Sequence, residues 1–143
     1  MASVTEAILA RVAAALINAS SAGPRVYRHR LDAFESSELP ALNVIRREDG
    51  LDPLGSNVER VLVNFEIECL AIGANWETVV DALHTQAHTA LLADAPLSLL
   101  GRGLRYLGSV TEGAAIDQVV GKLTARYQMQ VVVRPGDITQ AIS

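Results

Sequence analysis

Three side chains on one predicted helix have the residue types and the spacing of a metal site. Asp81, His84 and His88 follow one another at intervals of three and four residues, which places them on one side of a helix. Carboxylate and imidazole groups are common metal ligands. The sequence has no second cluster that would supply a fourth ligand, so a solvent-exposed helix face without a metal is the preferred interpretation. On that interpretation Asp81 and His88 are exposed.

Polar side chains that alternate along two predicted strands form the second candidate set. The strands at 58–72 and 119–134 both have apolar residues at every second position, which is typical of a sheet with one buried face. The positions between them include Glu66 and Glu68 on the first strand, and Lys122, Arg126 and Gln128 on the second. Opposite charges on neighbouring strands attract by a few tenths to ~1 kcal/mol per pair. The pattern fits either a solvated face or an interface, and we take these five residues as a candidate interface with other copies or a partner.

The common catalytic motifs are missing from the sequence. It contains no Cys-x-x-Cys pair, no Walker loop, no HExxH and no GxSxG. We therefore predict no enzymatic activity and no cofactor.

Composition narrows the class of protein. The chain has 143 residues, of which 50% are hydrophobic, and a net charge of −4, which argues against general nucleic-acid binding. The single cysteine, Cys69, excludes an intramolecular disulfide, and its apolar strand position predicts a buried side chain. The sequence has neither an apolar run of about 18 residues nor a signal peptide. We expect a soluble, intracellular chain with no membrane partner.

The periodicity of apolar residues predicts two helices and five strands. The helices are expected at 4–18, where Ser3 and Glu6 have the spacing of a capping box, and at 76–93, after Asn75 as N-cap. The strands are expected at 25–31, 41–49, 58–72, 104–111 and 119–134. A polar turn is expected at 48–57 and a loop at 94–103.

These elements predict an α+β fold of two layers. The short connections favour a mainly antiparallel, mixed sheet, and each helix needs an apolar surface to cover. Both helices therefore pack on the one apolar face, in the order α-β-β-β-α-β-β, and the polar face stays uncovered. We expect one domain over residues 1–143, with 135–143 as a flexible tail.

Several stretches together resemble a known family. They are ELPALNVIRRED (38–49), ERVLVNFEIECLA (59–71), WETVVDALHTQAHTALLAD (76–94) and LRYLGSVTEGAAIDQVVGKLTARYQMQV (104–131). This series, which extends over residues 7–134, is similar to the tail-terminator, or minor tail protein, family of long-tailed bacteriophages and their prophages. The sequence departs from the family at the acidic connection, where Glu112 and Asp117 are separated by GAAI.

The resemblance implies a small structural protein that forms a hexameric ring. The ring would cap the tail tube, end polymerisation of the tube protein and present a surface to the head-completion protein. No cofactor or reaction is implied. The chain would be in the host bacterial cytoplasm during assembly and then in the virion tail. The alternatives are another head–tail connector or completion protein, or a small bacterial binding module or enzyme.

Overall fold

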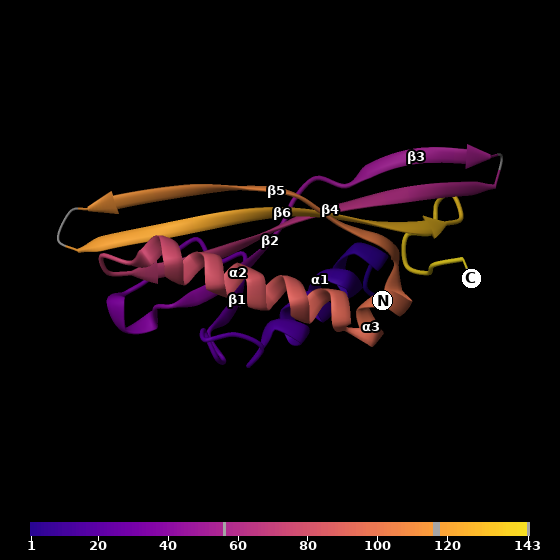
Figure 1. Ribbon diagram of the computed structural model, residues 1–143. Helices are drawn as coiled ribbons and strands as arrows, with labels where there is room; N and C mark the ends of the chain where they lie inside the picture. The colour runs from indigo at the N-terminus through magenta and orange to yellow at the C-terminus, as the bar shows by residue number, and fades with distance from the viewer. Residues whose placement is uncertain (56, 116–117, 143) are drawn as a thin grey trace.

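Helices pack on one face of a six-stranded sheet in the computed structural model, which describes residues 1–55, 57–115 and 118–142 (Figure 1). The helices are α1 (Val4–Leu16), α2 (Trp76–Ala93) and α3 (Ala95–Leu100), with a short 3₁₀ helix, η1 (Ser36–Glu38). The strands are β1 (Val26–Arg28), β2 (Ala41–Arg46), β3 (Gly50–Gly55), β4 (Val58–Ile72), β5 (Arg102–Ala115) and β6 (Val119–Val133). The predicted α+β sandwich is confirmed.

The two long strands β4 and β6 form the centre of the sheet. The order of the strands in the sheet is β1-β2-β4-β6-β5. Strands β3 and β2 share one edge of β4: β3 pairs with the first part of β4, and β2 pairs with the later part. Only the β1–β2 pair is parallel among the described strands. In Figure 1 the helices lie together beneath the sheet, and the β3–β4 and β5–β6 ribbons extend beyond them at opposite ends.

The alternation along β4 and β6 separates a core face from a polar face, as the sequence predicts. Phe65 and Ile67 of β4, and Ala125 and Tyr127 of β6, are buried in the cluster that includes the apolar stripes of α1 and α2. Cys69 belongs to the same cluster, and its burial raises the pKa of the thiol to about 12. It is therefore a small buried hydrophobic residue, as expected.

The helix ends agree only in part with the predicted caps. Ser3 accepts a hydrogen bond from the Glu6 N–H at the start of α1, but the Glu6 carboxylate binds Arg28 of β1 instead of closing a capping box. Helix α1 ends at Leu16, two residues before the predicted end. Helix α2 has the predicted bounds, but the Asn75 side chain makes no capping hydrogen bond.

Besides the short η1, a strand and a helix appear where the sequence predicts neither, so the structure adds them to the predicted order. Strand β3 lies within the expected polar turn at 48–57, where pairing with Val58–Leu62 of β4 holds a glycine- and proline-containing segment extended. Helix α3 lies within the expected loop at 94–103. The Asp94 carboxylate begins that helix by accepting from the Leu97 N–H, and it also binds Arg11 of α1 at 2.7 Å. Strand β3 is thus held by a hairpin with the strand that follows it, whereas α3 is held by a contact with Arg11, far away in the sequence.

Residues 134–142, which follow β6, return to the body of the fold. The Val4 N–H donates to the Ile138 carbonyl at 2.7 Å, and the Ile142 N–H donates to the Val132 carbonyl at 2.8 Å. These bonds join the C-terminal residues to the start of α1 and to β6. In the described part of the chain, no helix has the length and apolar character needed to span a membrane.

A tryptophan packed on two glycines fixes the start of α2 against the sheet. Gly113 of β5 and Gly121 of β6 are register partners, and the Trp76 ring lies over both. A Cβ atom at Gly121 would lie 1.9 Å from the ring, and one at Gly113 would lie 2.6 Å from it. Glycine is therefore required for this close approach.

Replacing Gly121 by alanine is expected to lower the free energy of unfolding by about 2–3 kcal/mol, because α2 must move away from the new methyl group. Urea unfolding followed by the fluorescence of Trp76, the one tryptophan in the chain, measures the change. Gly55→Ala is the matched control, since nothing lies within 4 Å of a Cβ atom there. Equal unfolding midpoints for the two variants would contradict the packing of Trp76 on Gly121.

Candidate functional site

The sheet surface opposite the helices carries all five predicted interface residues. We call this surface the open face. Glu66, Glu68, Lys122, Arg126 and Gln128 occupy the positions of β4 and β6 that alternate with the buried ones. A shallow hollow runs across the open face; its lining is Arg47, Glu66, Glu68, Val110, Glu112, Lys122, Thr124 and Arg126.

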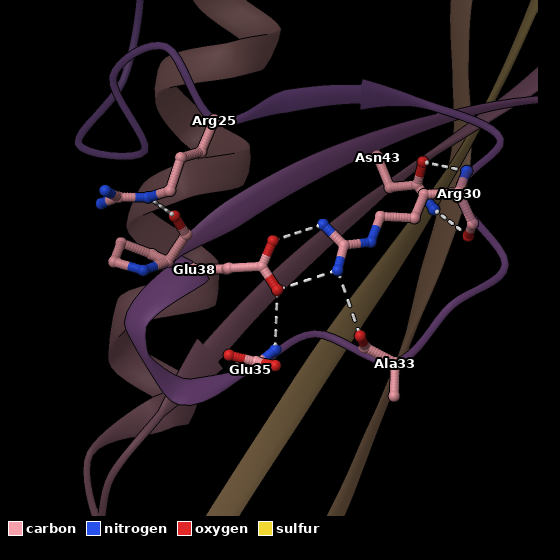
Figure 2. A network of polar contacts seen from close by, with 7 residues as sticks. Arg25, Arg30, Ala33, Glu35, Glu38 and Asn43 are labelled. Carbon is pink, nitrogen blue, oxygen red and sulfur yellow. Dashed lines mark hydrogen bonds and ion pairs between the residues drawn. The ribbon is translucent and has the colours of Figure 1, made fainter.

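Glu68 connects the open face to a buried amide. One carboxylate oxygen accepts from Lys122 at 3.2 Å, and the other accepts from the side-chain amide of Asn43 on β2 at 3.0 Å. Asn43 is fully buried, and its amide also exchanges two hydrogen bonds with the backbone of Arg30, at 3.0 and 3.1 Å (Figure 2). The position of Glu68 is thus fixed by the connection between β1 and β2.

The β1–β2 connection is itself held by an arginine. Arg30 donates to both carboxylate oxygens of Glu38, at 2.6 and 2.8 Å, and to the Ala33 carbonyl at 3.1 Å (Figure 2). Its guanidinium also lies over the rings of Tyr27 and Phe34, at 4.9 and 4.2 Å from their centroids. Arg30 lowers the pKa of the Glu38 carboxyl to about 2. These contacts order the segment that binds Asn43.

Glu66 and Arg126 are directly opposite in the ladder but form no ion pair. The Glu66 carboxylate accepts instead from Arg47, beyond the end of β2, at 2.6 Å. Gln128 donates to the Asn64 side chain at 3.1 Å. Arg126 is exposed. Its side chain forms no hydrogen bond or ion pair with any residue that the structure describes. The open face therefore combines fixed carboxylates with Arg126, a cation whose side chain has no polar partner in the described part of the chain.

The three metal candidates do not converge. His84 Nε2 and His88 Nδ1 both lie within hydrogen-bond distance of the Tyr127 hydroxyl, at 2.8 and 2.9 Å, whereas Asp81 is exposed. Over the described ranges, no three His, Cys, Asp or Glu side chains are grouped to hold a metal ion. His88 was expected to be exposed, but its ring is half-buried beside Tyr127.

Tyr127 explains why two histidines face the core. It lies at a buried position of β6, where its ring stacks on Phe65 with centroids 5.5 Å apart. A buried hydroxyl needs hydrogen-bond partners, and α2 supplies them. The signal in the sequence was a tyrosine at an apolar position of the strand. Burial lowers the pKa of His84, and the neighbouring His88 lowers it further.

No family model matches this sequence, and no curated protein matches it. Among solved structures, the chain is similar to one from a structure titled "Virion of native gene transfer agent (GTA) particle". The identity is 19%, the TM-score is 0.44, and the match covers 90% of this chain and 92% of that chain.

Acidification is expected to destabilise the fold through His84. Because the folded-state pKa of His84 is below its ordinary value of about 6.5, the folded state binds fewer protons than the unfolded state. The stabilisation is therefore present above pH ~6.5 and is lost as the pH falls below it. Thermal unfolding between pH 7 and pH 5 should show this loss, and it should be smaller in His84→Gln, whose amide does not titrate.

His29→Asn is the control for that experiment, since His29 is exposed and asparagine tolerates its positive φ of 49°. This control should keep the full pH dependence. An unchanged pH dependence in His84→Gln would contradict the assignment to His84.

Removing the Glu68 carboxylate is expected to cost more than removing that of Glu66, although both side chains are 15% exposed. Glu68→Ala leaves one of the two N–H groups of the buried Asn43 amide without an acceptor, while the other still donates to the Arg30 carbonyl. An unsatisfied buried donor costs about 1–3 kcal/mol. Glu66→Ala breaks a contact with an exposed arginine and should cost less than ~1 kcal/mol. Urea unfolding of the two variants tests this order, and an equal loss would contradict the Asn43 bond.

Proposed function

We propose that this chain is a structural protein of virion assembly. In this proposal it caps the tail tube of a long-tailed bacteriophage or prophage, ends polymerisation of the tube and helps form the head–tail joint. The sequence resemblance over residues 7–134 supports the family, and the open face supports a role in contacts between proteins. The assembly would form in the host bacterial cytoplasm and remain in the virion tail.

The observation that carries the proposal is the organisation of charge on the open face. Glu68 is held by Asn43 and Lys122, and Glu66 is held by Arg47, so both carboxylates keep fixed positions on β4. Surfaces whose side chains are already ordered lose less entropy when they bind. Arg126 extends from the same surface and is available to an acidic group of a partner.

The proposed assembly is a hexameric ring. A ring requires a heterologous interface, in which two different patches of each subunit meet head to tail. The open face would supply one of these patches, through Arg126 and the neighbouring carboxylates. The proposed partners are other copies of this chain, the tail-tube protein and the head-completion protein, with no cofactor and no chemical reaction.

Purified chain, added to the polymerising tube protein encoded with it, is expected to bind tube ends and yield tubes of defined length. Electron microscopy of negatively stained tubes measures the length distribution, and native mass spectrometry of the capped ends measures the number of copies. Tubes that elongate as if the chain were absent would rule out the capping role. Binding to head connectors alone would indicate another head–tail completion protein.

Arg126→Glu is expected to abolish capping while the chain still folds. Reversal places a negative charge where the proposed interface would bring an acidic group of the partner, so every symmetry-related contact of the ring is weakened. Circular dichroism and urea unfolding check the fold, and tube length checks the function. Glu77→Arg, an exposed reversal on α2, is the control and should cap normally. Normal capping by Arg126→Glu would reduce the open face to a solvated surface.

A further inference from the structure

Strand β5 is an unprotected edge of the sheet. Within the described residues it pairs only with β6, and most of its side chains are exposed on both faces. The other outer strands are less available, because β1 has three residues and β3 contains Pro53. Natural edges are usually blunted by lysine, proline, charge or bulges. The register shifts of β5 lie between Arg102 and Gly108, and the segment after them, Gly108–Ala115, contains a single charged residue, Glu112. Such an edge is open to pairing with another strand.

A bulge gives β5 a self-complementary pattern. The register with β6 shifts between Tyr106 and Gly108, so Leu107 is an additional residue. Because of this shift, Arg105 lies opposite Gln128 and Glu112 lies opposite Lys122, both on the open face. Leu107 and Val110, which are 38% and 60% exposed, lie between them. The open-face side of β5 therefore carries a basic, two apolar and an acidic side chain in that order.

We propose that β5 pairs antiparallel with β5 of a second copy of this chain, about a two-fold axis at Ser109. In this register Arg105 lies opposite Glu112 of the second copy, and Leu107 lies opposite Val110 of the second copy. Symmetry makes each contact twice. The two sheets join into one, and opposite charges and apolar side chains face each other across the new strand pair.

The charge pattern favours a second copy over an unrelated strand. Leu107 and Gly108 share one position of the ladder because of the bulge. Counted in this way, Arg105 and Glu112 are equally far from Ser109 on its two sides. Antiparallel pairing of β5 with itself therefore places each arginine opposite a glutamate. The two-fold contact is isologous, and it is distinct from the head-to-tail contact of the proposed ring. It describes a pair of free chains and does not depend on the capping function.

A cysteine on the proposed axis tests the pairing. Two Ser109 residues would meet with Cα atoms about 4.5–5.5 Å apart, which is within the range that a disulfide can bridge. Two Thr111 residues would lie about 13 Å apart along the strands, because each is opposite Tyr106. Ser109→Cys is therefore expected to form disulfide-linked dimers under mild oxidation, and Thr111→Cys, also exposed on β5, to stay largely monomeric. The native Cys69 is buried and should not interfere.

Equal cross-linking of the two cysteine variants, or none by Ser109→Cys, would overturn the proposed register. Charge variants add an independent measurement by sedimentation equilibrium. Arg105→Glu should raise the dimer dissociation constant about tenfold, since two attractive pairs become repulsive. The double variant Arg105→Glu/Glu112→Arg should return it to near the original value. A chain that is monomeric at every attainable concentration, or a double variant without recovery, would also overturn the pairing.

Tube capping is measured separately on the same proteins. Capping by a chain that never dimerises would overturn the β5 pair and leave the proposed function intact. Dimerisation by a chain that does not cap would overturn the proposed function and leave the β5 pair intact.

Discussion

The antiparallel pairing of β4 with β6 is the constraint on which the rest of the structure depends. Its register extends from Glu59 opposite Val133 to Ile72 opposite Val120, and it sets which side chains face the helices. A shift by one residue would exchange the buried and exposed sets. The same ladder that buries Phe65 against Tyr127 therefore holds Glu66 opposite Arg126 on the other face. Core and open face are two consequences of one register.

The sequence predicted these long elements because each carries its own periodic pattern. The bounds of β4 and α2 agree with those expected from alternation and from the helical stripe, since apolar burial along one face decides both. Strand β3 and helix α3 could not be predicted in this way. Their segments contain glycine or proline and little periodicity, and contacts with β4 and with Arg11 determine their conformation.

The sequence predicted on which face of the sheet the candidate residues lie, but it did not predict their hydrogen-bond and ion-pair partners. Alternation was sufficient to place Glu68 and Lys122 on one side of the sheet. The partners of the carboxylates come from elsewhere: Asn43 is held by the backbone of Arg30, and Arg47 follows β2. No spacing rule links these positions, because the β1–β2 connection brings them together. These contacts also make Glu68 a structural residue, whereas Arg126 on the same face is exposed and available to a partner.

Lys122 offers the most direct test that the open face is buried during assembly. It is the single lysine of the chain, so the N-terminal amine is the other primary amine, and Met1 is 95% exposed. The measurement is the rate of acetylation at Lys122 relative to the N-terminus, by mass spectrometry, in the free chain and in capped tube ends. If the open face forms a subunit or tube contact, the relative rate at Lys122 falls several-fold on capping. An unchanged relative rate in chains bound at tube ends would contradict the use of this face.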